Sequence, residues 1–170
     1  VITERMQEIG LINTFMATPY DQAGPYPEIQ TPANQRTDLF TTPDRAMQTT
    51  PGDMATLLMW LYQCAELGDG ALVMMYGDKL TQQECNAIID LMMRGDIRIM
   101  LEEGIPEGIP IAQKHGFGIS DTHGNIGIVY TPGGDYVIAM YLYKETFLEW
   151  EISSPLFVEV SAAVYRYFNP

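Results

Sequence analysis

The chain has 170 residues, of which 46% are hydrophobic and 18% charged, a composition typical of a globular protein rather than a disordered one. Nine Lys and Arg residues against 22 Asp and Glu residues give a formal net charge of −13. This charge argues against binding to nucleic acids or anionic membrane surfaces, and the apolar runs are too short to span a bilayer.

The first residues, VITERMQEIG, predict a helix because their apolar side chains recur at helical spacing. A chain that opens inside an amphipathic helix, with no initiator Met and no visible signal peptide, suggests a piece of a longer protein. An irregular region follows at about 19–49, rich in Pro, Thr, Gln and Asp. Loops of this length are usually functional or disordered.

The stretch TTPGDMATLLMWLYQCAELG predicts a helix with agreeing start and stop signals. Thr50 is expected to cap it, with Asp53 completing the cap, and Pro51 suits the first helical position. Gly68 is expected to end it. The helix therefore has well-defined limits in the sequence alone.

A second helix is predicted over TQQECNAIIDLMMRG, where Thr81 and Glu84 form a capping pair and Gly95 ends the helix. Each helix carries one cysteine, Cys64 or Cys85. We expect buried free thiols, because Cys is commonly a small core residue, although the two could pair in an oxidising compartment. Neither has a second Cys or a His at metal-ligand spacing, so no metal site is expected.

From Ile109 the pattern changes to that of strands, predicted at Ile109–Gly118, Ile126–Thr131 and Asp135–Tyr143. Turn signals at SDTHG and PGGD separate them, and the GGD turn suits a tight hairpin. His123 lies in the first of these polar turns and is expected to be solvated. The three segments therefore predict one antiparallel sheet.

A terminal helix is predicted over SSPLFVEVSAAVYRYF, with Ser153 or Ser154 as its cap and Pro155 at its start. The residues expected to face the sheet are Leu156, Val160, Ala163 and Val164. The pattern predicts an α+β fold in one domain over 1–170. Residues 1–108 would be mostly helical, and 109–170 would hold the three strands and the terminal helix.

Four features follow one another along the chain: TTPGDMA at a helix start, AQKHG in a strand, the hairpin GIVYTPGGDYVIAMYLY and a terminal helix. This ordered set resembles class A β-lactamases and related serine penicillin-recognising enzymes. The resemblance is to their C-terminal part and covers essentially the whole chain. The TTP start occurs wherever a helix is capped, whereas AQKHG followed by the hairpin is more specific. It implies a β-lactamase/DD-peptidase-like fold, an antiparallel sheet flanked by helices, lacking the N-terminal part.

Of the family motifs S-x-x-K, S-D-N and K-T-G, only the third has a counterpart, as Lys114-His115-Gly116. The resemblance implies that Lys114 is catalytic, as a cation near the substrate carboxylate and the nucleophile. It also implies that His115, Gly116 and Phe117 bind substrate, with His in the place of Thr making the charge depend on pH. We expect Lys114 to be buried on the helical side and His115 to be more exposed. Without the resemblance, Lys114 is an ordinary solvated lysine.

The region 19–49 would correspond to the Ω loop of the family. The resemblance implies Asp38 as the base that activates the deacylating water, with Arg36 and Thr42 at similar offsets. However, its side chain is one methylene shorter than the Glu of the family, and Gln48 replaces the acidic residue that pairs with the Arg. Outside the resemblance, Asp38 is a solvated loop carboxylate.

No Ser in the chain is followed by Lys three residues later, so the nucleophile motif is expected upstream of Val1. The first hypothesis is part of a serine acyl hydrolase acting on β-lactams or peptidoglycan-like amides. The alternative is a non-catalytic binding or structural protein that keeps the fold. No metal or organic cofactor is implied. The resemblance implies a place in the cell envelope or outside the cell, and a second copy could cover the open sheet edge.

Overall fold

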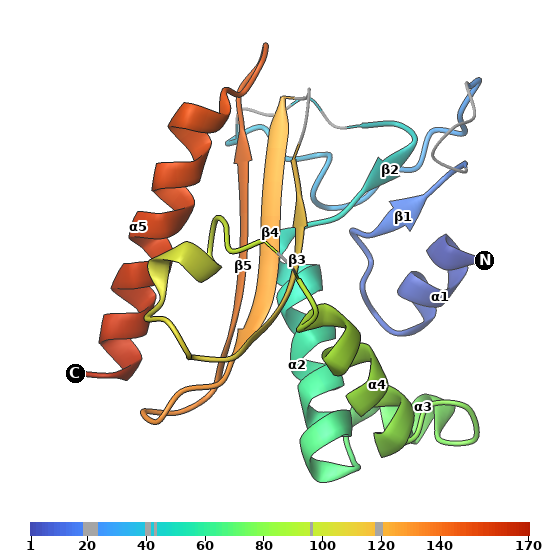
Figure 1. Ribbon diagram of the computed structural model, residues 1–170. Helices are drawn as coiled ribbons and strands as arrows, with labels where there is room; N and C mark the ends of the chain where they lie inside the picture. Colours follow the sequence, from blue (N-terminus) through green and yellow to red (C-terminus); the bar gives the residue numbers. More distant parts are fainter. Residues whose placement is uncertain (19–23, 40–41, 43, 96, 118–120) are drawn as a thin grey trace.

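The chain folds into layers around one antiparallel sheet of three strands (Figure 1). Helix α5 (Trp150–Phe168) lies on one face of this sheet, and helices α2 (Pro51–Leu67) and α4 (Gln82–Met92) lie on the other. This arrangement confirms the predicted α+β fold. The structure is a computed structural model, which describes residues 1–18, 24–39, 42, 44–95, 97–117 and 121–170.

The sheet consists of β3 (Ile111–Gly116), β4 (Thr122–Val129) and β5 (Tyr136–Tyr143), in that spatial order, with antiparallel pairing throughout. The predicted hairpin between β4 and β5 is confirmed, and Gly134 takes a φ of 122° in its turn. Such a φ favours glycine. The predicted end of the first strand, Gly118, lies outside the described residues.

Strand β4 begins four residues earlier than the sequence predicted, at Thr122 rather than Ile126. Its first residue pairs with Tyr143, so the ladder with β5 continues through most of SDTHG. Cross-strand pairing therefore outweighs the local turn preference of these residues. As a result His123, expected to be solvated, lies in a strand and is only 2% exposed.

Two hydrophobic cores lie on the two faces of the sheet, as the alternation of strand side chains requires. One core joins α2 and α4 to the sheet and includes Leu58, Leu61, Ile89, Ala112 and Ile128. The other joins α5 and the loop before β3 to the sheet and includes Met100, Leu101, Ile111, Val129 and Phe157. Helices on both faces thus hold β3 in place.

Helix α2 begins and ends as predicted. The Thr50 side chain accepts a hydrogen bond from the Asp53 amide at 3.1 Å, and Gly68 ends the helix in the left-handed conformation, with φ 63°. The Asp53 carboxylate has a further role, because it accepts hydrogen bonds from the Asn13 amide at 3.0 Å and the Thr14 hydroxyl at 2.7 Å. It therefore fixes the N-terminal segment to α2.

Helix α4 has the predicted capping box, in which the Glu84 carboxylate accepts a hydrogen bond from the Thr81 amide at 3.0 Å. The helix ends at Met92, three residues before the predicted stop at Gly95. The start signal was therefore more accurate than the stop signal.

Substituting Thr81→Ala should lower the free energy of unfolding by about 1 kcal/mol, because the helix loses the side-chain acceptor at its N-terminus. Urea unfolding followed by circular dichroism measures this change. The control is Thr146→Ala, at an exposed position outside the helices. Equal stability of the two variants would contradict the capping role.

Cys64 and Cys85 form a disulfide between α2 and α4, with their Cα atoms 5.9 Å apart. The prediction of free thiols is therefore wrong. Both residues are fully buried, as that prediction assumed, but the packing of α2 on α4 brings them within bonding distance. The sequence alone did not show how close the two cysteines lie, because that depends on how α2 packs on α4.

Helix α5 begins at Trp150, before the predicted cap, and contains Pro155 in its interior. Three of its four predicted inward residues are exposed, namely Leu156 at 42%, Val160 at 40% and Ala163, whereas Val164 packs on the core as predicted. The buried residues are Ser153, Ser154, Phe157 and Ser161. Small serine side chains let α5 approach closely, and the Ser161 hydroxyl donates to the Leu101 carbonyl at 2.6 Å.

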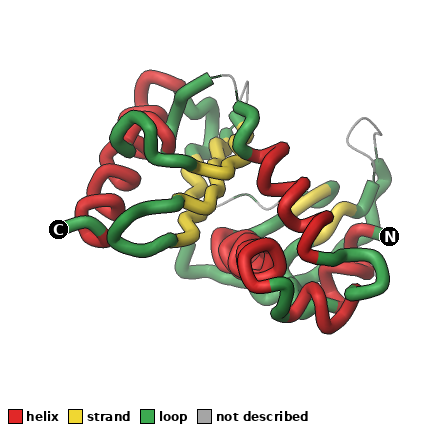
Figure 2. Tube along the Cα trace, turned by 60° about the horizontal axis from the view of Figure 1, so that its bottom comes forward, coloured by secondary structure: helices red, strands yellow, loops and turns green. Residues whose placement is uncertain are grey.

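The N-terminal third is tied together by a short ladder. The predicted first helix is confirmed as α1 (Ile2–Glu8), and β1 (Phe15–Met16) pairs with β2 (Met47–Gln48). Helix α3 (Ala71–Tyr76) and the 3₁₀ helix η1 (Glu102–Gly104) complete the described elements. The two termini lie on opposite sides of the molecule (Figure 2). Among the described residues, no helix has the length and apolarity needed to cross a bilayer.

Candidate active site

The strand β3 presents the Lys114-His115-Gly116 motif at one edge of the sheet. Lys114 is in register with Ile126, which packs on the core beneath α2 and α4, so its side chain belongs to that face. His115 is in register with Asn125 on the opposite face. The strand thus places Lys114 and His115 on different faces of the sheet, as the alternation of side chains along a strand predicts.

Lys114 itself is exposed, which contradicts the expected burial. The core beneath α2 and α4 includes Ala112, two residues earlier, but does not include Lys114. The Lys114 ammonium instead donates a hydrogen bond to the carbonyl of His115 at 2.5 Å. The cation is therefore accessible to an anionic ligand at the strand edge.

His115 is half-buried, and its pKa is lowered, first by this burial and then by the charge of Lys114. Both effects disfavour the imidazolium, because burial removes hydration and a nearby cation repels a second positive charge. At neutral pH the ring is thus a neutral hydrogen-bonding group.

Removing the neighbouring charge should raise the pKa of His115. We expect this shift in Lys114→Ala, measured by NMR titration of the imidazole signals, which come from two histidines only. Lys79→Ala, which removes an exposed lysine from another part of the chain, serves as the control. An unchanged pKa in Lys114→Ala would show that the two groups do not interact.

Four rings form an aromatic cluster at the end of β3: His115, Phe117, His123 and Trp150. The Phe117 ring lies 5.2 Å from His115 and 4.7 Å from Trp150, centroid to centroid. His123 Nδ1 lies 2.7 Å from the hydroxyl of Ser153, so β4 is linked to the first turn of α5. The cluster joins the motif strand to α5. The sequence did not predict it, because the contacts of Phe117 with Trp150 and of His123 with Ser153 depend on where α5 begins.

A buried polar network supports the backbone of the motif. Asn125 is fully buried, and its amide nitrogen donates to the Lys114 carbonyl at 3.3 Å and to the Gln113 side chain at 3.2 Å. Its oxygen accepts from the Leu101 amide at 3.2 Å, while Gln113 donates to Glu102 at 2.5 Å. Because buried polar groups must be paired, these bonds fix β3 against η1 and the loop before it.

The candidate base Asp38 is paired with Arg36. Two hydrogen bonds of 2.9 and 2.5 Å join the guanidinium to the carboxylate, and they lower the pKa of Asp38 to about 2. Both side chains are exposed. Gln48, which stands where the family has an acidic partner for the Arg, bonds elsewhere: its side-chain amide donates to the Asn13 carbonyl at 2.9 Å. A carboxylate with so low a pKa is a weak proton acceptor.

The long loop reaches the sheet through a different residue. The hydroxyls of Thr42 and Tyr143 lie 2.7 Å apart. Tyr143 is in register with Thr122, on the same face as Lys114. The resemblance predicts that the long loop reaches this face of the sheet and that Asp38 acts there. The loop does reach this face, but the contact is made by Thr42.

The described residues contain no group of three or more His, Cys, Asp or Glu side chains that could hold a metal ion. Within the described part of the chain, the site offers the exposed ammonium of Lys114, the neutral imidazole of His115 and an edge of β3 with no strand paired to it. These are groups that bind an anionic ligand by charge and hydrogen bonds.

Solved structures with the same fold include PBP-A, which is 25% identical over 98% of this chain and 49% of that chain, with a TM-score of 0.67. An ancestral class A β-lactamase is 20% identical, covering 98% of this chain and 54% of that one, with a TM-score of 0.66. A β-lactamase from Burkholderia ambifaria is 16% identical, covering 99% and 55%, with a TM-score of 0.62. No curated protein sequence matches the chain.

The chain thus spans about half the length of the structures it matches. A family model for the β-lactamase enzyme family matches residues 1–168, nearly the whole sequence. Fold and sequence agree, and the chain belongs to the β-lactamase enzyme family.

Proposed function

We propose that this chain is part of a serine β-lactamase-like acyl hydrolase that acts on β-lactams or peptidoglycan-like amides. The observation that carries the proposal is the position of Lys114 on the edge strand β3, on the face covered by α2 and α4, followed by His115 and Gly116. Lys114 would attract the substrate carboxylate and assist the nucleophile, while His115, Gly116 and Phe117 would bind the substrate. One PBP-A structure is an acyl-enzyme complex with penicillin G, which supports this substrate class.

The nucleophile of the proposed reaction would come from a polypeptide segment outside this sequence, because no Ser here has Lys three residues later. In the covalent step, the serine oxygen would attack the β-lactam carbonyl and the ring C–N bond would open. Water would then release the acyl group. Asp38 is the candidate base for that second step, and its pairing with Arg36 predicts slow release.

A chimeric protein tests the proposal. It joins the half of PBP-A that this chain does not match to Val1–Pro170 and is incubated with a fluorescent penicillin. We expect a covalent adduct that survives denaturing electrophoresis and is released slowly. A folded chimera that never forms the adduct would refute the hydrolase function.

The chain by itself should not hydrolyse β-lactams, because it lacks the S-x-x-K motif. A chromogenic cephalosporin such as nitrocefin, mixed with the purified protein, should turn over at the background rate. Turnover that disappears on replacing one of the serines present would contradict this expectation.

The second candidate is a non-catalytic protein that binds the same ligands. The Arg36–Asp38 pair favours it, because this pairing leaves the candidate base poorly suited to activate water. Reversible penicillin binding by the folded chimera, without an adduct, would support this alternative.

The disulfide between Cys64 and Cys85 supports a place outside the cell or in the cell envelope. Disulfides persist in oxidising compartments and are rare in the reducing cytosol. We propose this location on that ground together with the family membership.

A further inference from the structure

Asn125 is a buried polar side chain that contacts the motif strand directly. It is fully buried and in register with His115, so it belongs to the face of the sheet that α5 covers. Its oxygen accepts a hydrogen bond from the Leu101 amide at 3.2 Å, and its nitrogen donates to the Lys114 carbonyl at 3.3 Å. A single side chain thus joins the strand that carries the motif to the loop before η1.

These two hydrogen bonds require the chemistry of a side-chain amide. A backbone N–H can only donate and a backbone carbonyl can only accept, so the side chain between them must offer one acceptor and one donor. An aspartate carboxylate would lack the donor, and leucine, which has a similar shape, would lack both. Because an unpaired polar group in the interior is costly, Asn125 holds both backbone groups in place.

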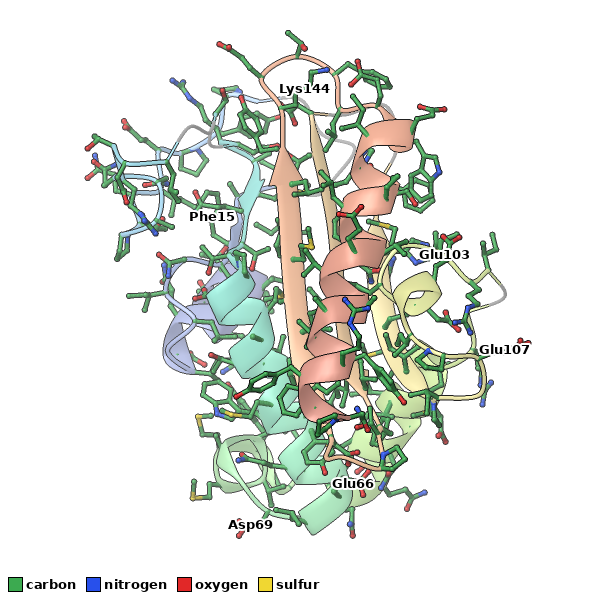
Figure 3. All side chains as sticks on the ribbon, turned by 90° about the vertical axis from the view of Figure 1, so that its left-hand side faces the viewer. Phe15, Glu66, Asp69, Glu103, Glu107 and Lys144 are labelled. Carbon is green, nitrogen blue, oxygen red and sulfur yellow. A yellow bond between two sulfur atoms is a disulfide. The ribbon has the colours of Figure 1, made fainter. Side chains whose placement is uncertain are left out.

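The loop to which Asn125 is bonded is itself fixed on α5. The Ser161 hydroxyl donates to the Leu101 carbonyl at 2.6 Å, and a Cβ at Gly104 of η1 would collide with the Val158 carbonyl of α5. Figure 3 shows η1, the short yellow helix, beside α5. Met100 is fully buried with a φ of 54°, a left-handed conformation that only its surroundings can maintain. Leu101 is therefore a rigid point to which β3 is tied.

The bond to β3 affects where the Lys114 ammonium lies. Successive carbonyls along a strand point to opposite edges of that strand. Asn125 holds the Lys114 carbonyl on the β4 side, so the next carbonyl, that of His115, points to the outer edge of β3, which has no strand paired to it among the described residues. The Lys114 ammonium donates to this carbonyl at 2.5 Å. Asn125 thus sets the direction of the acceptor that holds the cation.

We propose that Asn125 is a positioning residue for Lys114, because it ties the peptide between residues 114 and 115 to Leu101 and so holds the ammonium at the outer edge of β3. The inference rests on the proposed function, in which this cation attracts the substrate carboxylate and assists the nucleophile. Asn125 acts only through β3 and does not touch the substrate. Its effect on the site therefore depends on the presence of the Lys114 side chain.

A double-mutant cycle tests this dependence without any substrate. The pKa of His115, followed by NMR titration of the 170-residue chain, reports how near the Lys114 charge lies. We expect Asn125→Leu to raise this pKa, because the ammonium is released from the edge carbonyl. In the Lys114→Ala background, Asn125→Leu should leave the pKa unchanged. A general loosening of the sheet would instead change it in both backgrounds.

Ser161→Ala is the matched control for this cycle. It removes the other hydrogen bond to Leu101 from a side chain that is also fully buried, but it does not touch β3. The pKa of His115 should therefore stay at the value of the unaltered chain.

Labelling by fluorescent penicillin extends the cycle to the proposed reaction. In the PBP-A chimera, Asn125→Leu should lower the rate of labelling by roughly tenfold, because small displacements of a catalytic group are costly. In the Lys114→Ala background it should have no further effect. A Lys114-dependent shift of the His115 pKa with no labelling of any folded chimera would support the positioning role and refute the hydrolase.

Four results would overturn the inference: an unchanged His115 pKa in Asn125→Leu, an equal shift in both backgrounds, an equal shift in Ser161→Ala, or an equal loss of labelling in both backgrounds. Asn125→Ala, which removes the same hydrogen bonds, replaces Asn125→Leu if that variant does not fold. Failure of both variants to fold, measured by circular dichroism, would make Asn125 a structural residue and would also overturn the inference.

Discussion

Removing the disulfide between Cys64 and Cys85 should lower the free energy of unfolding by about 3 kcal/mol. The bond closes a loop between residues 21 positions apart and joins α2 to α4 inside the core under the sheet. Without it, the unfolded chain gains conformational freedom while the folded chain loses a covalent link. Urea unfolding of oxidised and reduced protein measures the difference.

The Cys64→Ala/Cys85→Ala double variant is the control for this experiment, because a reductant should not change its stability. Hydrogen exchange should locate the loss at α4, whose contact with α2 the disulfide maintains. Equal unfolding midpoints for oxidised and reduced protein would show that the bond is absent in solution or contributes nothing.

The sequence predicted local features with a local cause and failed where distance in space decides. The caps at Thr50 and Thr81 and the hairpin before β5 depend on neighbouring residues, and all three are confirmed. The state of Cys64 and Cys85 depends on how two helices pack, and that prediction was wrong. Local signals thus located the starts of α2 and α4, but they did not show which side chains meet.

The terminal helix shows a second reason for failure. A hydrophobic count favoured Leu156 and Val160 as inward residues, but the buried positions include Ser153 and Ser161. These serines are paired, with His123 and with the Leu101 carbonyl. A hydrogen-bond partner from a distant strand or loop makes a polar residue suitable for the interior, and periodicity alone does not reveal such partners.

The candidate site was predicted in part. The resemblance placed Lys114 and His115 on an edge strand, and the structure has them there on opposite faces. It did not predict that Asp38 pairs with Arg36, because the spacing of two residues does not show which carboxylate a guanidinium will reach. Nor did it predict Asn125, whose role depends on the register of β3 and β4.

Lys114→Ala should reduce penicillin acylation of the PBP-A chimera by roughly 10²- to 10³-fold, because it removes the charge that stabilises the anionic substrate and transition state. The ammonium is exposed at the strand edge, so its loss should leave the fold intact. The rate of fluorescent-penicillin labelling measures the effect, and thermal unfolding of the variant checks its stability.

His115→Thr is the matched comparison at the adjacent position and should keep or increase the rate of acylation. Threonine preserves a hydrogen-bond donor at the mouth of the site, and its smaller side chain leaves more room for substrate. It also removes the 5.2 Å contact with Phe117, so a loss of rate in this variant alone would assign the aromatic cluster a role in positioning substrate. Labelling of Lys114→Ala at the rate of the unaltered chimera would instead remove the main support for the proposed function, since the exposed cation on β3 would then take no part in the reaction.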